Sequence, residues 1–275
     1  MPVIATQRDD IKKLKGLHLY HFAASNCSQR VRMALEEKGL QWTSHHVNLS
    51  KNEHATDAFQ ALNPKGVVPV LIHDGKTITE SNDIITYIDD EFDGPMLRPD
   101  GAAEKAFLTN ALQRSSDIQA ALKAVSFEFL FKPARRMTSD QLSAYAAIVK
   151  DRALVEFMRE FSSRQGFSEE KIRGHVQEMV SACSFLEEHL ESSRWLNGES
   201  FGLADISWIV NIYRLDKMAF PLQQYPCLSD WLMRVSRRNS FEKAIKQYES
   251  TAMRCYFSLY TLFRKLKGTG VSRFL

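Results

Sequence analysis

The sequence predicts a small mixed α/β domain followed by an all-α domain. Short strand-like and helix-like segments alternate between Leu17 and Phe92, whereas apolar residues at helical spacing dominate from Ala102 onward. Between them, "DGPMLRPDG" is rich in Pro, Gly and Asp, which is typical of a domain boundary. We therefore expect domains at residues 15–96 and 102–265, and a tail at residues 266–275.

The first domain is predicted to begin with a strand, a helix and a second strand. "LHLYHF" reads as the first strand, and the next segment is a helix because Val31, Ala34 and Leu35 share one face. Lys38-Gly39 is a helix stop. The stretch "WTSHHVNL" reads as the second strand, and the polar segment after it as a loop with a short helix.

A hairpin and a further helix complete this domain. "VVPVLIHDGKTITES" reads as two strands joined by a turn at Asp74-Gly75. Ser81 then caps a helix in which Ile84, Ile85 and Ile88 share a face. The predicted order is βαβ, a short helix, then ββα.

The second domain is predicted to be helical throughout. Apolar side chains recur every three or four residues in two long runs, which contain Phe107, Leu108, Ala111, Leu112, Ile118, Leu122 and Val125, and then Ile172, Val176, Met179, Val180, Cys183 and Leu186. In "ESFGLADI", Asp205 can reach back to the N-cap backbone at Gly202 and stabilise a helix start.

The tail combines basic and aromatic residues. Four of its side chains share a helical face: Tyr256, Leu259, Tyr260 and Phe263. This face can cover a substrate pocket, contact an anionic surface or pack on the protein, and we expect packing.

The composition is that of an ordinary globular protein. The 275 residues are 44% hydrophobic and 25% charged, and the net charge of +3 gives no support for nucleic-acid binding. No apolar run is long enough to span a membrane, and the first residues lack a signal-peptide pattern, so we expect a cytoplasmic protein. The four cysteines are widely separated, so we expect neither a disulfide framework nor a metal site.

Four ordered motifs carry a family resemblance. "SNCSQRVRMALEEKGL" resembles the zeta-class signature of the cytosolic glutathione transferases. "ALNPKGVVPVL" resembles their Asn-Pro loop and Val-Pro pair, "ITESNDIITYI" their Glu-Ser motif, and "GLADISWI" their capping segment. The resemblance implies a thioredoxin-like first domain, an all-helical second domain, glutathione as cosubstrate, and a homo- or heterodimer.

A narrower resemblance concerns the second domain. The segment that begins "SSRQGFSEEK" is similar to the bacterial glutathione-dependent β-aryl etherases, which cleave lignin-derived ether dimers. Those proteins also carry an Asn where this chain has Asn26. This resemblance implies a small aromatic electrophile as the second substrate.

Two stretches can hold the backbone and the glutamyl end of glutathione. A cis Val68-Pro69 bond would present the backbone N–H and C=O of Val68 to the cysteinyl residue. Glu80 can bind the α-ammonium group, and Ser81, at a helix N-terminus, the γ-glutamyl carboxylate. The alternatives are a proline at a strand start and an ordinary helix cap.

The glycyl end of glutathione needs a donor or a cation. The position before the Val-Pro pair, commonly Gln in relatives, is Val67 here. Lys51, His54 and Lys65 lie in loops that can replace it. For each of these three, solvated surface charge is the alternative.

The turn before the first helix can stabilise the glutathione thiolate. Ser25 can donate its O–H to the sulfur, and Asn26 its amide N–H. Cys27 can instead form a mixed disulfide, although the cysteine of the omega-like branch aligns with Ser25. Helix capping is the alternative for all of them, and Ser28 is expected to be a cap only.

The second domain is expected to supply the aromatic substrate pocket. "AVSFEFLFKPARRM" places Phe127, Phe129 and Phe131 near Arg135 and its neighbour, which suits an aryl ligand with a cationic rim. Trp208, and with it Tyr213, is a further candidate. Packing in the helical core is the alternative for each aromatic residue.

The sequence therefore predicts a glutathione transferase, with glutathione thiolate attacking an electrophilic aromatic substrate and no metal taking part. Release of a phenol from an α-aryloxy ketone is the narrower expectation. The alternatives are zeta-like cis–trans isomerisation, reduction of glutathionyl mixed disulfides through Cys27, and a weakly active binding or partner subunit.

Overall fold

The computed structural model describes residues 3–4 and 8–275 and divides into two compact units. The first unit extends to Pro95 and also contains Met137–Ser162. The second contains Met96–Arg136 and Ser163–Leu275. The segment Met137–Ser162, which sequence reasoning assigned to the helical domain, thus clusters with the first unit. The boundaries expected from the sequence stay a prediction.

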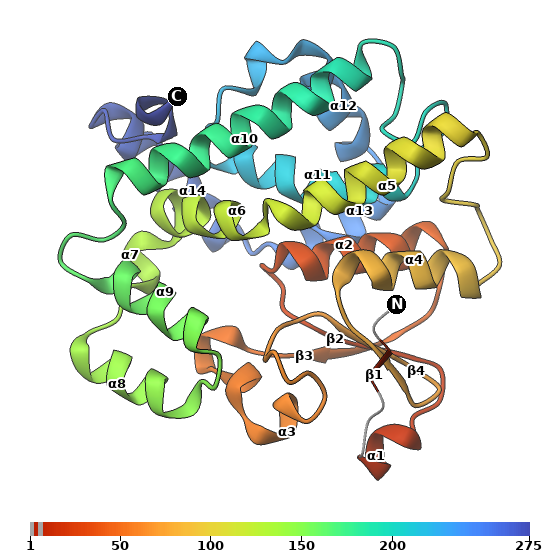
Figure 1. Cartoon of the computed structure of the whole chain (residues 1–275), viewed down its shortest axis with the longest axis horizontal. Coiled ribbons are helices and arrows are strands. Elements are labelled where there is room, and N and C mark those ends of the chain that lie inside the picture. Colours follow the sequence, from red (N-terminus) through yellow and green to blue (C-terminus); the bar gives the residue numbers. More distant parts are fainter. Residues whose placement is uncertain (1–2, 5–7) are drawn as a thin grey trace. The chain divides into compact units, whose positions relative to one another are not determined.

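The first unit contains a mixed sheet (Figure 1). Its described strands are β1 (Val3–Ile4), β2 (Leu17–His21), β3 (Thr43–His46), β4 (Val70–His73) and β5 (Lys76–Ile78). They lie in the order β1-β5-β4-β2-β3, with β2 parallel to β3 and the other neighbours antiparallel. The predicted hairpin is confirmed, with Asp74 and Gly75 at positive φ between β4 and β5.

The first unit also contains helices. They are α1 (Asp9–Lys12), α2 (Asn26–Glu37), α3 (Asp57–Gln60), α4 (Ser81–Glu91), α8 (Ser139–Ile148) and α9 (Arg152–Ser162). The predicted βαβ-ββα order is confirmed, and β1 and α1 precede it. One position is corrected: the N-cap of α4 is Glu80, and Ser81 is the first helical residue.

Alternating side chains give the sheet two packed faces. α2 and α4 pack against each other on one face, where Leu19, Leu71 and the isoleucines of α4 are fully buried (Figure 1). Val68, Val70 and Ile72 join a second apolar cluster with side chains of α1 and α3. Burial on both faces fixes the strand register and hence the loops at the strand ends.

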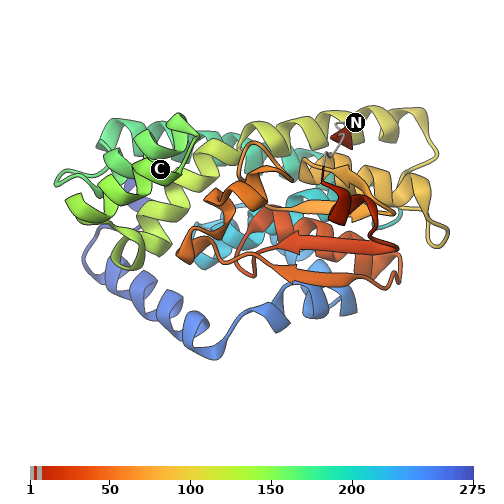
Figure 2. The ribbon, with the colours of Figure 1, turned by 90° about the horizontal axis from the view of Figure 1, so that it is seen from below.

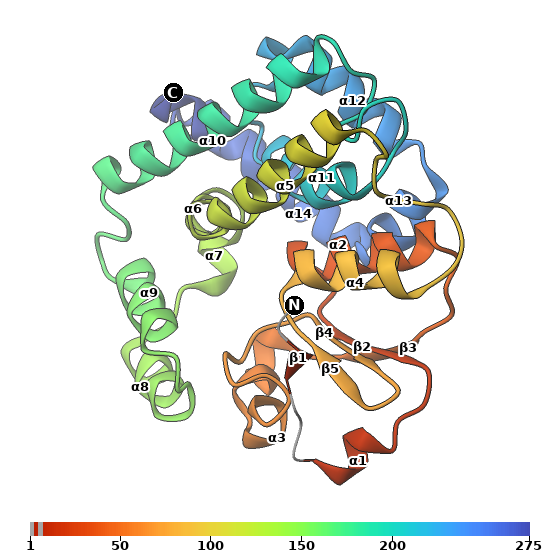
Figure 3. The same ribbon diagram turned by 45° about the vertical axis from the view of Figure 1, so that its right-hand side comes forward.

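The second unit is helical. Its elements are α5 (Ala102–Asp117), α6 (Gln119–Ser126), a π-helical turn (Phe127–Phe131), α7 (Lys132–Arg135), α10 (Glu169–Leu190), α11 (Leu203–Lys217), α12 (Pro226–Ser236), α13 (Asn239–Ala244) and α14 (Thr251–Leu266). α11 is almost entirely buried and packs against α5 and α12, while α10 packs against α6 and α12 (Figure 3). None of the described helices combines the length and the apolar character that crossing a membrane requires.

Asp205 stabilises the start of α11 as expected. Its carboxylate accepts hydrogen bonds from the backbone N–H of Gly202 (3.0 Å) and Leu196 (2.9 Å) and from the indole of Trp231 (2.7 Å). Burial raises the pKa of Asp205 to about 6, against these donors. Gly202 replaces the usual Ser or Thr cap because a Cβ there would lie 2.2 Å from the carbonyl oxygen of Leu97.

Candidate functional site

Two of the predicted stretches meet at one end of the sheet in the first unit. In the antiparallel pair of β2 and β4, Tyr20 lies opposite Val70. The chain leaving β2 therefore lies beside the chain entering β4. The first leads to Ser25 at the start of α2, and the second contains Val68-Pro69.

Arg30 links the third predicted stretch, which contains Glu80 and Ser81, to the same end of the sheet. Its guanidinium is almost fully buried, and Nη1 donates a hydrogen bond of 2.7 Å to Oγ of Ser81. Arg30 lies in the second turn of α2 and Ser81 is the first residue of α4, so this bond joins the N-terminal ends of the two helices. Burial lowers the pKa of Arg30, and the neighbouring Cys27 opposes that change.

The bond from Arg30 also orients the hydroxyl of Ser81. A hydroxyl has one donor hydrogen, and its oxygen accepts from Arg30 here. The hydrogen of Ser81 is therefore available to another acceptor. A guanidinium and a helix N-terminus both attract negative charge, so an anion is the ligand that this arrangement favours.

Ser25 is the N-cap of α2, and its situation is similar. Its Oγ accepts a hydrogen bond of 3.3 Å from the backbone N–H of Ser28, which leaves its own hydrogen for a further partner. Capping and ligand binding are thus compatible at this residue. Ser28 is not the cap: it is fully buried, and its Oγ accepts from the N–H of Phe22.

A second buried arginine holds the turn that presents Ser25. Arg32 donates to the carbonyl oxygens of Phe22 (3.3 Å) and Ala23 (3.0 Å) and to Nδ1 of His21 (3.1 Å). Because the arginine can only donate, Nδ1 of His21 accepts, and its Nε2–H donates to Ser44 at 2.7 Å. Burial, followed by the charge of Arg32, lowers the pKa of His21 to about 3.

Asn26 and Cys27 occupy the first two positions of α2. Oδ1 of Asn26 is buried and has no hydrogen-bond partner among the described residues. Such a group is costly to leave unpaired, so a donor from a ligand would stabilise it. Cys27 is half-buried, and none of the four cysteines forms a disulfide.

The loop before β4 is held by Asn63. The Val68-Pro69 peptide bond is cis. Asn63 donates from Nδ2 to the carbonyl oxygen of Val67 (2.8 Å) and accepts from the backbone N–H of Lys65 (3.1 Å). The buried amide therefore fixes the segment that leads into Val68, while the side chain of Val67 is exposed.

Glu80 and Lys65, predicted for opposite ends of glutathione, contact each other. Nζ of Lys65 lies 2.6 Å from Oε1 of Glu80, and this hydrogen bond raises the pKa of Lys65. Both side chains are largely exposed, so the pair contributes little stability. Glu80 has φ of 64°, a left-handed conformation that costs about 1 kcal/mol or more outside glycine and is typical of functional sites.

The other two candidates for the glycyl end differ in exposure. Lys51 is exposed at the end of a 3₁₀ turn, Leu49–Lys51. His54 is buried in the next turn, with its carbonyl oxygen close to Gly66. Gly66 has φ of +62°, so a side chain there would be strained as well as crowded.

The three phenylalanines of the second unit do not form one wall. Phe127 and Phe131, four residues apart, are in edge contact at 5.8 Å between ring centroids. Phe129 lies on another side of the turn, buried, with the guanidinium of Arg264 at 4.9 Å from its ring centroid. Helical geometry separates residues two apart, so only Phe127 and Phe131 stay half-exposed together.

The cationic rim and Trp208 also differ from the expectation. Arg135 is half-buried at the end of α7, and Arg214 lies over Phe131, at 5.3 Å from the ring centroid. Trp208 is fully buried in α11, and its indole donates to the carbonyl oxygen of Ala111 at 2.9 Å. Trp208 therefore has a packing role in the core of the second unit.

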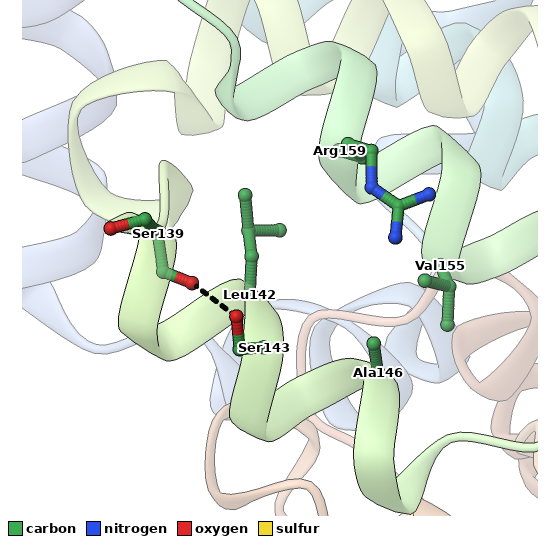
Figure 4. A pocket seen from close by; sticks show the side chains of 6 residues that line it. All are labelled: Ser139, Leu142, Ser143, Ala146, Val155 and Arg159. Carbon is green, nitrogen blue, oxygen red and sulfur yellow. Dashed lines mark hydrogen bonds between the residues drawn. The ribbon is translucent and has the colours of Figure 1, made fainter.

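Two shallow cavities lie elsewhere. One, of about 350 Å³ between α8 and α9, is lined by Ser139, Leu142, Ser143, Ala146, Val155 and Arg159 and contains none of the predicted site residues (Figure 4). The other, of about 430 Å³ in the second unit, is lined in part by Tyr213, Leu232 and Arg237. The hydroxyl of Tyr213 donates to Glu249 at 3.0 Å.

Sequence reasoning missed the two buried arginines. A signal was present, because Arg30 lies four residues before Ala34 and so on the predicted inward face of the helix. A charge on an inward face indicates a buried polar contact. The partner of that charge is fifty-one residues away in sequence and becomes evident only in the folded unit.

Known protein families match both parts of the chain. The family model described as "Glutathione S-transferase, N-terminal domain" matches residues 19–96, and the one described as "Glutathione S-transferase, C-terminal domain" matches residues 151–234. Glutathione S-transferase 1 of Dianthus caryophyllus is 27% identical over 87% of this chain and 91% of its own length.

Two bacterial relatives have more specific names. Protein LigF of Sphingobium sp. SYK-6 is 27% identical over 84% of this chain and 93% of its own length. Its crystal structure, described as a β-etherase, superimposes with a TM-score of 0.75 over 84% of this chain and 99% of that one, at 26% identity. Maleylacetoacetate isomerase of Pseudomonas aeruginosa is 26% identical over 76% of this chain and 86% of its own length.

The first prediction concerns His21 and pH. Its pKa of about 3 in the folded protein lies below the value of about 6.5 for a free histidine, so the unfolded chain binds the extra proton as pH falls. The stability that neutral His21 contributes is present above pH ~6.5 and declines towards pH ~3. Between pH 7 and pH 5 we expect it to fall by about 2 kcal/mol.

Urea unfolding of the wild type and His21→Gln at both pH values measures this contribution. Glutamine keeps a donor for Ser44 and does not titrate, so the variant should lose less stability than the wild type over this range. His175→Gln, on α10, is the control for the same exchange outside the contacts of His21. Equal pH dependence in the wild type and His21→Gln would contradict the assignment.

Proposed function

Because the chain belongs to the glutathione S-transferase family, we propose that it activates the thiol of glutathione for attack on an electrophilic aromatic substrate. The observation that carries the proposal is the hydrogen bond from Arg30 to Ser81. It holds two helix N-termini together at the sheet end where the Val68-Pro69 segment and Ser25 also lie. In this proposal the start of α4 binds the γ-glutamyl carboxylate of glutathione. The Val68-Pro69 segment pairs with its backbone, and Ser25 contacts its sulfur.

The γ-glutamyl end of glutathione would bind at the start of α4. Ser81 donates its free hydrogen to the carboxylate, and the charge of Arg30 beneath it adds attraction. Glu80 accepts from the α-ammonium group while keeping its contact with Lys65. In this arrangement Lys65 helps to position Glu80. Lys51 and His54 would then bind the glycyl carboxylate.

The cysteinyl residue would pair with the backbone of Val68, in the manner of one added rung of a sheet. Its sulfur then faces the start of α2. Ser25 donates its free hydrogen to the sulfur and Asn26 supplies its side-chain amide, so the thiolate is favoured over the thiol. The thiol proton passes to solvent, and neither residue needs to act as a base.

The aromatic substrate would lie against the second domain. Phe127 and Phe131 offer half-exposed rings, and Arg135 a half-buried cation at the end of α7. The likeness to LigF supports an α-aryloxy ketone as substrate. Attack of the thiolate forms a carbon–sulfur bond, breaks the ether bond and releases a phenolate, which takes a proton from solvent. We further propose a cytoplasmic dimer, homo- or heterodimeric, as is common in this family.

Three alternatives make different chemical predictions. The likeness to maleylacetoacetate isomerase supports cis–trans isomerisation, in which glutathione is regenerated. Reduction of a glutathionyl mixed disulfide would require attack by Cys27. A binding or partner subunit, which Val67 in place of the Gln common in relatives supports, would retain glutathione without turnover.

The second prediction tests which residues activate the thiol of glutathione. Loss of one donor to an anion corresponds to roughly 1.5–3 kcal/mol, so Ser25→Ala or Asn26→Ala should lower kcat/KM by about tenfold to a hundredfold. Cys27→Ala should stay within about twofold of the wild type. Initial rates with a fixed electrophile and varied glutathione give these values, and ultraviolet absorbance of the bound thiolate reports its pKa.

Ser168→Ala is the matched control for Ser25→Ala. Ser168 caps α10, and its side chain accepts from the N–H of Lys171 at 3.1 Å. Both variants lose an N-cap, at a cost of about 1 kcal/mol, but only one loses a donor to sulfur. Loss of turnover in Cys27→Ala alone would replace the proposed mechanism by mixed-disulfide chemistry.

The third prediction concerns the products. An α-aryloxy ketone incubated with glutathione and the protein should give one glutathione adduct and one free phenol for each glutathione consumed. Mass spectrometry of the mixture measures all three species. A cis-dienoic acid and a glutathionyl disulfide are tested in parallel. Isomerisation without consumption of glutathione, or reduction of the disulfide alone, would contradict the transferase assignment.

A further inference from the structure

α14 is anchored to the second unit by one face only. Phe257 is buried and in edge contact with Phe131, at 5.6 Å between ring centroids. Nη1 of Arg264 donates to the carbonyl oxygen of Glu128 (2.8 Å) and lies 3.1 Å from its carboxylate. These contacts define the packed face of the helix.

The opposite face is apolar and exposed. Its side chains are Leu259, Leu262, Phe263 and Leu266, and their exposed fractions are 67%, 53%, 54% and 79%. Spacings of three, four and seven residues place them on one stripe of the helix. The expectation that Leu259 and Phe263 pack on the protein is therefore wrong, because the packed face is centred on Phe257 and Arg264 instead.

Basic side chains flank the stripe, and its own segment contains no acidic residue. No Asp or Glu follows Glu249 in the sequence. Arg264 and Arg273 pair with Glu128 and Glu169, whereas Lys265 and Lys267 are exposed. At 100° per residue these two lysines lie on opposite sides of the stripe. The ammonium of Lys267 is 5.9 Å from the ring centroid of Phe263.

We propose that this face of α14 docks on an anionic phospholipid bilayer. α14 is the blue helix along the lower edge of Figure 2. The apolar stripe would enter the boundary between headgroups and acyl chains, and Lys265 and Lys267 would meet lipid phosphates. Large aliphatic and aromatic side chains bordered by lysines are the composition that such interfacial helices require.

Charge favours a bilayer over a second copy of the chain. α14 contains no acidic residue, so a second copy facing it would offer Lys265 and Lys267 no opposite charge, and in a parallel arrangement the lysines would repel their own equivalents. An anionic membrane surface attracts the same lysines. The stripe lies on the helix surface with no acid in its segment to oppose that attraction. This inference is independent of the glutathione chemistry.

Vesicle sedimentation of the full chain provides the fourth prediction. The wild type should sediment with vesicles of phosphatidylcholine and phosphatidylglycerol, and at least about tenfold less with phosphatidylcholine alone. Added salt should weaken the binding, because it screens the lysines. Leu262→Asp/Leu266→Asp should lower the affinity by at least about tenfold, and Lys265→Glu/Lys267→Glu by a similar factor.

Met233→Asp is the matched control, since Met233 is an apolar side chain on α12 that is 51% exposed. It should bind vesicles as the wild type does. Circular dichroism and light scattering of all variants accompany the assay. Failure of the wild type to bind anionic vesicles would overturn the proposal, as would full binding by Leu262→Asp/Leu266→Asp. So would a wild-type dimer that this double variant converts to a monomer, because the stripe would then be an interface between copies.

Discussion

The buried guanidinium of Arg30 is the constraint on which the candidate site depends. Burying a charge costs several kcal/mol unless polar partners surround it. The structure supplies one at Ser81, and the bond between them fixes the N-terminal ends of α2 and α4 relative to each other. Two helix dipoles and one cation then concentrate positive potential at a single place, which a carboxylate would relieve. This explains why the hydroxyl of a small side chain can serve as the anion-binding group.

Buried polar groups also position the remaining parts of the site, by holding the segments that carry Ser25 and Val68. Arg32 and His21 hold the turn that carries Ser25, and Asn63 holds the loop that leads into Val68. Buried networks of this kind stay rigid when fully paired. The groups that would contact glutathione are therefore short side chains or backbone, whose geometry depends on the residues behind them.

Local patterns predicted most of the first unit because each element had its own signal. The hairpin at Asp74-Gly75 and the helix of Val31 and Ala34 depend on neighbours in sequence, and both were predicted correctly. Contacts between distant residues were not predictable: the pair of Lys65 with Glu80 joins two loops, and Met137–Ser162 clusters with the first unit. The packing of the tail was not predictable from local patterns either, because it depends on a contact between distant residues. Periodicity located the helical faces of α14, but which face packs was decided by Arg264 and its distant partner Glu128.

The central claim is that Ser81, oriented by Arg30, binds the γ-glutamyl carboxylate of glutathione. Calorimetric titration of glutathione and of cysteinylglycine, which lacks the glutamyl group, into the wild type and Ser81→Ala tests it most directly. Ser81 is not the cap of α4, so alanine is compatible with the helix. The account predicts that the wild type prefers glutathione by at least about tenfold and that the variant loses most of this preference. Equal affinity of the wild type for the two ligands, or an unchanged preference in Ser81→Ala, would contradict it.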